Sequence, residues 1–171
     1  MDFIDLKTQQ NRIRKGLNVR FDRILEHGAY IMGPEVNELE EKLADYCGVK
    51  HAISCSSGTD ALLIPLMAWN IGPGDAVFTT PFTYVATAEV ISLLGATPVF
   101  VDVYESTFNI DCEKLELAIQ NTISEGKLIP KAIIPVDLFG LPARYRLIEE
   151  IAKKYNLKVI EDAAESLGSF Y

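Results

Sequence analysis

The strongest constraint on the fold of this sequence is a repeated alternation between short apolar runs and longer segments with helical periodicity. The apolar runs cover residues 52–55, 76–80, 98–101, 132–135 and 159–160. Strands separated by helices indicate a mostly parallel sheet with helices on both faces, joined by right-handed crossovers. We therefore predict an α/β fold with three layers, in which a mostly parallel sheet lies between two layers of helices.

Two helices are predicted before the first strand. The first ends at Gly28, and the second begins at Pro34 and ends before Gly48, which are the residue types favoured at such ends. Their apolar faces consist of Ile13, Leu17, Phe21, Ile24 and Leu25 in the first helix and Val36, Leu39, Leu43 and Tyr46 in the second. We expect residues 1–50 to form a helical segment and residues 51–171 to form the strand–helix units.

Three residues help to place the later helices. Asp111 is predicted to cap a helix, and Asn156 is predicted to end the helix that starts near residue 143. Pro65 lies inside the helix expected after residue 59, where a proline removes one backbone hydrogen bond at a cost of about 3 kcal/mol. At Pro65 we expect either a kink or a helix that restarts.

Composition excludes several classes of function. The net charge of −8 argues against binding of nucleic acid or of an anionic membrane through bulk charge. Cys47, Cys55 and Cys112 are scattered and odd in number, so we expect reduced thiols in a cytoplasmic protein and predict no metal site. The first residues lack the apolar core of a signal peptide, and no stretch is apolar enough to span a bilayer.

The first motif that could carry chemistry follows the run at residues 52–55. It reads Ser56-Ser57-Gly58-Thr59-Asp60 and opens a predicted helix. A glycine lets the backbone approach a ligand closely, and the free N–H groups of a helix start can hold a phosphate. The same residues also suit a plain N-cap. No GxGxxG pattern follows any predicted strand, so a dinucleotide site is not expected.

Two further motifs follow later strands. Tyr84, within the segment 81–84, could lie flat on a planar heterocycle or could simply pack at a helix start. Asp162, within the segment 161–165, could face a ring nitrogen or could belong to an acidic surface pair. In an open α/β sheet, ligands bind beyond the carboxyl ends of the strands, so all three motifs are expected at one edge. Together they supply a phosphate cup, a stacking ring and an acid for a pyridine nitrogen, which are the needs of pyridoxal 5′-phosphate (PLP).

The chain resembles the DegT/DnrJ/EryC1/StrS family of PLP-dependent nucleotide-sugar aminotransferases over nearly its whole length. The similarity lies in the runs FIDLKTQQ, YIMGPEVNELEEKLADYCGVKHAISCSSGTDAL, PFTYVATAEVISLLGATPVFVDV, AIIPVDLFG and VIEDAAESLGS. The resemblance implies the PLP-dependent transferase fold of type I. It implies that residues 1–171 are the N-terminal part of the PLP-binding large domain, without its C-terminal part and without the small domain.

The resemblance also assigns roles to individual residues. By this likeness Gly58, Thr59 and Asp60 would hold the cofactor phosphate through the loop and the helix start. Tyr84 would stack on the cofactor ring, and Asp162 would pair with its pyridine nitrogen.

Glu165 falls where relatives often carry glutamine or histidine near the phenolic oxygen of PLP. A charged glutamate beside a phenolate would be unfavourable, so this residue is expected either to be protonated there or to point elsewhere. The family's catalytic lysine, which forms the Schiff base with PLP, is expected beyond Tyr171. The fragment alone is therefore predicted to be inactive.

For the intact protein the resemblance implies transfer of an amino group, with glutamate as the expected donor, to a keto group of a nucleotide-linked sugar for surface polysaccharide or a related product. Family members are homodimers, and residues 30–34 could take part in the shared site. Two alternatives stay open. One is a PLP-dependent dehydratase of keto-deoxy sugars from the same family, and the other is a non-catalytic binding or assembly fragment. No nucleic-acid or membrane partner is expected.

Overall fold

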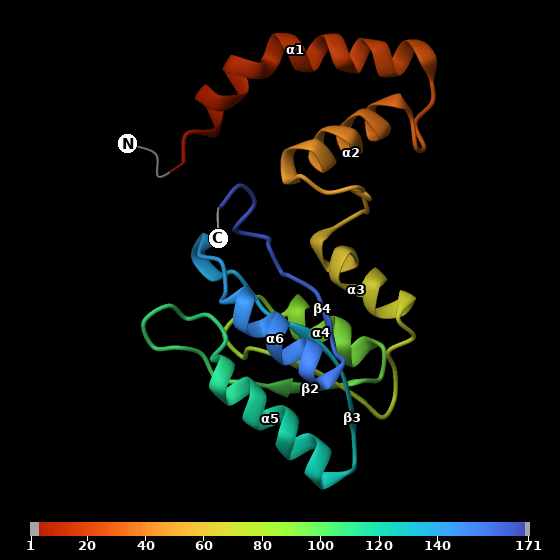
Figure 1. The fold of residues 1–171 in the computed structure, drawn as a ribbon. Helices are drawn as coiled ribbons and strands as arrows, with labels where there is room; N and C mark the ends of the chain where they lie inside the picture. Colours follow the sequence, from red (N-terminus) through yellow and green to blue (C-terminus); the bar gives the residue numbers. More distant parts are fainter. Residues whose placement is uncertain (1–3, 170–171) are drawn as a thin grey trace. The chain divides into compact units, whose positions relative to one another are not determined.

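The computed structural model describes residues 4–169, and the polypeptide divides into two units at Ser54 and Cys55 (Figure 1). The first unit contains the helices α1 (Leu6–His27) and α2 (Pro34–Cys47). Both end at a glycine in the left-handed region, Gly28 and Gly48, as predicted. Among residues 4–169, no helix is both long enough and apolar enough to cross a bilayer.

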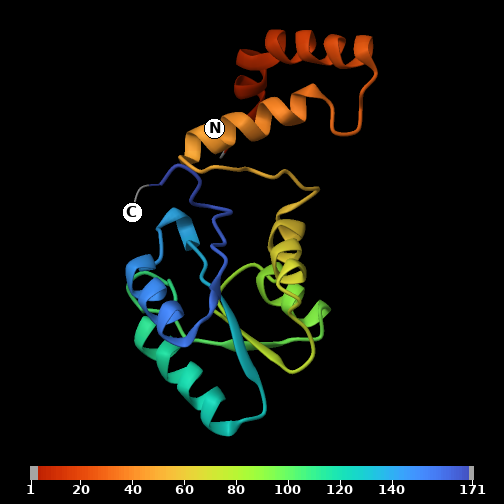
Figure 2. The same cartoon turned by 45° about the vertical axis from the view of Figure 1, so that its right-hand side comes forward.

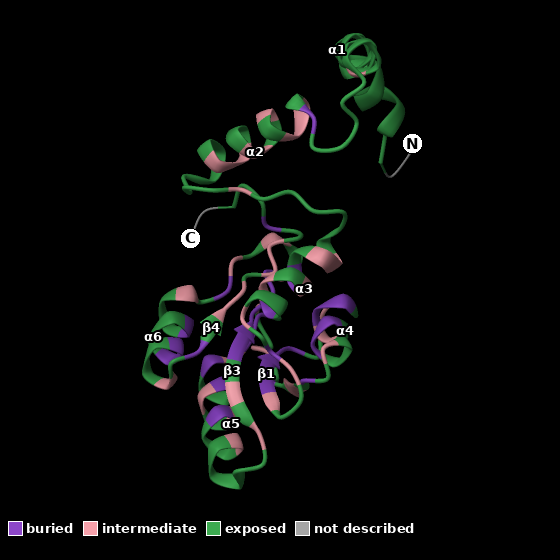
Figure 3. Cartoon of the chain, turned by 90° about the vertical axis from the view of Figure 1, so that its right-hand side faces the viewer, coloured by how far each residue is buried: buried purple, intermediate pink, exposed green. Residues whose placement is uncertain are grey.

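Ion pairs join the two helices of the first unit. The Arg20 guanidinium donates to both carboxylate oxygens of Glu38 at 3.0 and 2.9 Å, and His27 Nε2 lies 3.1 Å from Glu35. Both predicted helices form, but neither α1 nor α2 contains a buried residue, so the apolar face of α2 is not the inner face that was expected (Figure 3). Two helices alone have too little surface in contact to cover apolar stripes of this width.

The second unit is built on a four-stranded parallel sheet. Its strands are β1 (Asp75–Thr79), β2 (Thr97–Phe100), β3 (Ile129–Ile134) and β4 (Lys158–Val159). The order across the sheet is β2-β1-β3-β4, and every neighbouring pair is parallel. Backbone pairing continues past β4, because the Asp162 N–H donates to the Pro135 carbonyl at 3.0 Å. The predicted α/β fold with a parallel sheet is confirmed.

Helices cover both faces of this sheet (Figure 2). They are α3 (Gly58–Ala68), α4 (Ala86–Leu93), α5 (Cys112–Glu125) and α6 (Tyr145–Tyr155). Alternate strand residues form two separate cores because successive side chains point to opposite faces. One core combines Ala76, Phe78 and Ile133 with side chains of α5 and α6, and the other combines Val77, Ala132 and Ile134 with side chains of α3 and α4.

The capping residues in the sequence predicted most helix ends correctly. Asp111 caps α5 by accepting from the backbone N–H groups of Glu113 and Lys114, and Asn156 ends α6 in the left-handed region. Of the two expectations for Pro65, a restart of the helix is wrong, since α3 runs without interruption from Gly58 to Ala68, and a kink stays a prediction. Packing of Leu62 and Leu66 in the core offsets the hydrogen bond that the proline removes.

The strand predicted at residues 52–55 is absent from the described part of the chain. Ile53, Ser54 and Cys55 are exposed and have no strand assignment. An apolar run becomes a buried strand only when neighbouring strands satisfy its backbone, and no neighbour pairs with this one among residues 4–169. Instead, the Ser54 N–H donates to the Glu40 carboxylate at 2.7 Å.

Candidate functional site

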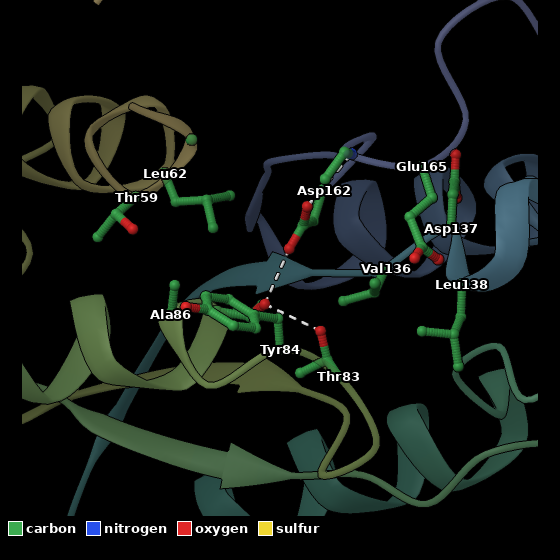
Figure 4. A pocket seen from close by; sticks show the side chains of 13 residues that line it. Thr59, Leu62, Thr83, Tyr84, Ala86, Val136, Asp137, Leu138, Asp162 and Glu165 are labelled. Carbon is green, nitrogen blue, oxygen red and sulfur yellow. Dashed lines mark hydrogen bonds between the residues drawn. The ribbon is translucent and has the colours of Figure 1, made fainter. Parts of the chain in front are cut away.

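The topology places a crevice at the carboxyl ends of β1 and β3. From β1 the chain crosses through α4 to β2, and from β2 it returns through α5 to β3 on the other side of β1. Connections that leave neighbouring strands in opposite directions open a gap beyond the strand ends, which is where α/β proteins bind ligands. The second unit has a cavity of about 390 Å³ at this edge (Figure 4).

Five of the six predicted cofactor-binding residues line this single cavity: Gly58, Thr59, Tyr84, Asp162 and Glu165. Four segments supply the wall, namely the start of α3, the turn before α4, the turn after β3 and the segment after β4. Figure 4 shows Thr59 on one side of Asp162 and Glu165 on the other, with the Tyr84 ring across from Asp162. Most of the wall is apolar, as is usual for small-molecule sites.

The start of α3 presents free backbone donors to the cavity. Ser57 caps the helix through its hydroxyl, which accepts from the Asp60 N–H at 3.1 Å. Gly58 and Thr59 are the first helical residues, and N–H groups at these positions have no partner within a helix. A methyl group built on Gly58 would meet no atom within 4 Å, so a ligand can approach the backbone there.

Asp60 is the sixth predicted residue, and it does not line the cavity. Its carboxylate accepts a hydrogen bond from the Ser56 hydroxyl. In this position Asp60 braces the turn that precedes α3. A contribution to phosphate binding would then act through the backbone that it holds, because its carboxylate would repel a phosphate.

Asp162 is fixed through both its backbone and its side chain. Its N–H donates to the Pro135 carbonyl, and its own carbonyl accepts from the Asp137 N–H at 3.1 Å. Its Oδ2 accepts from the Thr87 hydroxyl at 2.8 Å. Thr87 is fully buried and its Oγ1 lies 3.0 Å from Thr83 Oγ1. The carboxylate is thus held in place before any ligand binds.

Asp137 was not among the predicted site residues, yet among residues 4–169 it is the buried group beside the cavity with the most side-chain hydrogen bonds. Its carboxylate accepts from the Ala143 N–H at 2.8 Å, the Tyr145 hydroxyl at 2.7 Å and the Ser166 hydroxyl at 2.8 Å. The residue is 1% exposed. Burial, together with the Asp137 carboxylate, raises the pKa of Tyr145 above its ordinary value. The position of Asp137 directly after a strand, like that of Asp162, was the signal available in the sequence.

Thr87 and Thr83 were also missed, although both lie in the run that was compared with the family. Thr87 follows Thr83 by four residues, a spacing that brings side chains together over one helical turn. The remaining cavity residues that the sequence analysis did not name are Leu62, Ala86, Val136, Leu138 and Ala164. They contribute apolar wall, and their role depends on tertiary contacts that no local pattern records.

Glu165 points toward a backbone amide of the neighbouring turn. Its Oε2 accepts from the Phe139 N–H at 2.6 Å, in the short 3₁₀ turn η1 (Leu138–Gly140). Phe139 has a φ of +58°, a region that is unfavourable for residues other than glycine. Its ring lies 6.1 Å from that of Phe108 and 6.5 Å from that of Phe82. Glu165 also lines the cavity, so both expectations for its side chain remain predictions.

Glu161 precedes Asp162, and its carboxyl group is hydrogen-bonded to Asp137. Loss of hydration on burial, followed by this hydrogen bond and by the charge of Asp137, raises the pKa of Glu161 to about 7. The unfolded chain releases this proton near pH 4.5, whereas the folded chain keeps it until about pH 7. Within this window the folded state binds more protons, so the free energy of unfolding falls as the pH rises.

We expect Glu161→Gln to stabilise the chain above pH 7 by roughly 1 kcal/mol, because the amide keeps a donor toward Asp137 without a charge. The residue is exposed overall, so solvent screens part of the effect. Near pH 4 both chains are uncharged at this position and should have equal stability. Urea unfolding across this pH range measures the difference, with Glu149→Gln on the exposed face of α6 as the control. A gain that is the same at every pH would contradict the prediction.

Comparison with known proteins identifies relatives of this chain. The model of the DegT/DnrJ/EryC1/StrS aminotransferase family matches residues 11–171. A UDP-2-acetamido-2-deoxy-3-oxo-D-glucuronate aminotransferase from Pseudomonas aeruginosa is 53% identical over 100% of the chain and 46% of its own length. The chain thus spans about half the length of the curated relatives that it matches.

Solved structures of aminotransferases also match this chain. A DegT DnrJ EryC1 StrS aminotransferase from Brucella abortus matches with a TM-score of 0.96 and 56% identity, over 98% of this chain and 45% of that one. A Streptococcus pneumoniae structure in its PLP form matches with a TM-score of 0.73 and 34% identity, over 82% of this chain and 38% of that one.

The residues around the cavity fit PLP, which the Streptococcus pneumoniae structure contains. The α3 start offers N–H donors for a phosphate, the exposed Tyr84 ring offers a flat apolar surface, and Asp162 offers a fixed carboxylate. The cavity volume lies within the range of small-molecule sites. When bound, PLP supplies an electron sink, and a carboxylate at its pyridine nitrogen keeps that nitrogen protonated.

Proposed function

The chain belongs to the DegT/DnrJ/EryC1/StrS aminotransferase family, and we propose that it forms the cofactor-binding part of a PLP-dependent enzyme that aminates a keto group of a nucleotide-linked sugar. The names of its relatives support the kind of reaction. We further propose glutamate as the amino donor and a cytoplasmic role in the synthesis of polysaccharide or related sugars.

The observation that carries the proposal is the meeting of three chemically different groups at one cavity. Gly58 and Thr59 are proposed to hold the phosphate through their N–H groups, and Asp60 is proposed to brace that turn. Tyr84 is proposed to cover one face of the ring, and Asp162 to hold a proton at the pyridine nitrogen. These residues are proposed to bind and orient the cofactor, but none of them is the lysine that forms the Schiff base with PLP. For that reason we propose that the 171-residue chain alone does not transfer amino groups.

Binding of pyridoxamine 5′-phosphate (PMP) tests the site directly. PMP has no aldehyde, so it cannot react with surface lysines as PLP does. Trp69 is the only tryptophan and lies at the opposite end of α3 from Gly58, about 17 Å away along an 11-residue helix. Because PMP absorbs where tryptophan emits, saturable quenching of Trp69 fluorescence is expected.

Pyridoxamine without its phosphate is the matched control ligand. If the α3 start holds the phosphate, pyridoxamine should bind at least tenfold more weakly than PMP. Equal affinity for the two ligands, or quenching by PMP that does not saturate, would overturn the proposal. Incubation of the chain with PLP, glutamate and a keto acid should yield no amino transfer, and measurable transfer would refute the proposed inactivity.

The exposed apolar face of α1 supports the proposal that the protein is a homodimer. Leu17 and Phe21 are 44% and 64% exposed, on a helix without buried residues. Exposed apolar surface of this kind favours association. We expect the chain to self-associate at micromolar concentration in analytical ultracentrifugation and the Leu17→Gln/Phe21→Gln double variant to sediment at lower mass. A native chain that remains monomeric throughout would contradict the prediction.

A further inference from the structure

We propose that Thr87 is a positioning residue, which orients the Asp162 carboxylate through a directed pair of hydroxyl hydrogen bonds and so helps to keep the cofactor's pyridine nitrogen protonated. The inference rests on the proposed function, since it concerns how the same cavity holds its cofactor. It assigns a role to Thr87, which is hydrogen-bonded to Asp162, and to Thr83, which is hydrogen-bonded to Thr87.

The direction of the hydrogen bonds follows from the number of available protons. A threonine hydroxyl has one hydrogen and two lone pairs. Thr87 gives its hydrogen to Asp162 Oδ2, at 2.8 Å, because an ionised carboxylate can only accept. The 3.0 Å contact between the two threonines must then run from the Thr83 hydroxyl to Thr87 Oγ1. Both hydroxyl dipoles therefore point toward the carboxylate, and each strengthens the other.

Burial makes this arrangement hard to replace. Thr87 is fully buried, and among the described residues its hydroxyl contacts only the Thr83 hydroxyl and the Asp162 carboxylate. Among residues 4–169, the other carboxylate oxygen, Oδ1, accepts only a long hydrogen bond of 3.4 Å, from the Ala164 N–H. Thr87 thus holds one oxygen firmly, and the more weakly bonded Oδ1 is the oxygen that we propose faces a ring nitrogen. Figure 4 shows the two hydrogen bonds as a continuous path from Thr83 to Asp162.

A threonine that acted only in packing would behave differently from one that orients a charge. Valine has nearly the same shape as threonine, but it lacks the hydroxyl, so Thr87→Val removes the hydrogen-bond donor with little change in volume. Without the Thr87 donor, the Asp162 side chain can rotate or take up water, because the residue is partly exposed. The contact between carboxylate and ring nitrogen should then weaken, which a packing role does not predict.

The test measures the pyridine nitrogen itself. PMP labelled with ¹⁵N in the ring is bound to the chain, and its ¹⁵N chemical shift reports whether the nitrogen is protonated. In the native complex we expect a shift near the pyridinium value. In Thr87→Val we expect a clear move toward neutral pyridine and about fivefold weaker binding, the effect of one hydrogen bond. Thr87→Ser should restore the native shift.

Thr79→Val is the matched control, because Thr79 is also fully buried and its hydroxyl donates to the Ile134 carbonyl, away from Asp162. It should cost stability but leave the ¹⁵N shift unchanged. A native shift in Thr87→Val, or an equal change in Thr79→Val, overturns the inference.

A second variant covers the case in which Thr87→Val does not fold. Thr83→Val removes the outer hydroxyl of a partly exposed residue, so folding should tolerate it. A smaller move of the ¹⁵N shift in the same direction, with about twofold weaker binding, supports the inference, and an unchanged shift overturns it. Absence of PMP binding to the native chain would refute the proposed function itself. PMP binding with no response to the threonines would refute only this inference.

Discussion

An Asp162→Asn variant should bind PMP about 30-fold more weakly than the native chain. Asparagine has the same shape and keeps an oxygen for the Thr87 hydroxyl, so the substitution removes the charge with little change in packing. Hydrogen bonds to charged groups contribute about 1.5–3 kcal/mol, and about 2 kcal/mol corresponds to a 30-fold change in affinity. Titration of Trp69 fluorescence with PMP measures the two dissociation constants.

The matched control for this variant is Asp102→Asn. Asp102 follows β2 at the same edge of the sheet, but its exposed carboxylate pairs with Lys114 and does not line the cavity. Its substitution should leave PMP affinity within a factor of two. Loss of affinity in both variants would indicate a general effect of acidic charge at this edge. If Asp162→Asn bound PMP with native affinity, the proposal that the Asp162 charge holds the pyridine nitrogen would be contradicted.

Replacement of Asp137 should have the largest effect on stability. In Asp137→Ala, the Ala143 N–H and the Ser166 hydroxyl lose a buried acceptor, and Tyr145 loses its 2.7 Å bond to the same carboxylate. Each buried donor left without a partner costs about 1–3 kcal/mol, so we expect a loss of roughly 3–4 kcal/mol. That is a large share of the stability of an ordinary domain. Urea unfolding at pH 7 gives the difference in free energy.

Asp102→Ala provides the control for removal of a carboxylate. Its ion pair with Lys114 is exposed, so its loss should cost less than about 1 kcal/mol. A loss for Asp137→Ala no larger than for Asp102→Ala would show that the three hydrogen bonds contribute little. The Asp137 variant should also bind PMP more weakly, since the Asp137 backbone and side chain hold the segment that carries Asp162.

The strand–helix alternation in the sequence was sufficient to predict the parallel sheet and the edge at which the motifs meet. The strand predicted at residues 76–80, observed at Asp75–Thr79, and the helix cap at Asp111 were found because each carries a signal within a few neighbouring positions. The strand at residues 52–55 was predicted on the same kind of evidence and was wrong. Its apolar residues needed a pairing partner, and no local pattern reveals whether one exists.

In the candidate site, too, some residues could be found from local sequence motifs, and others only from contacts with distant segments. Gly58, Tyr84 and Asp162 could be singled out because glycine, a ring and a carboxylate each followed a predicted strand. Their roles toward the cofactor remain predictions. Asp137 and Thr87 could not be ranked above other polar residues, since their importance comes from burial and from partners up to 75 positions away.

By itself the sequence determined four of the five predicted strands, their parallel arrangement, and the motifs around Gly58, Tyr84 and Asp162, because periodicity and end signals act over one or two turns. Only the tertiary structure decided the sheet order β2-β1-β3-β4, the burial of Asp137 and the pairing of Thr87 with Asp162. The physical reason is that a buried polar group is stable only where distant segments supply its hydrogen-bond partners. Those partners meet only when the sheet has formed.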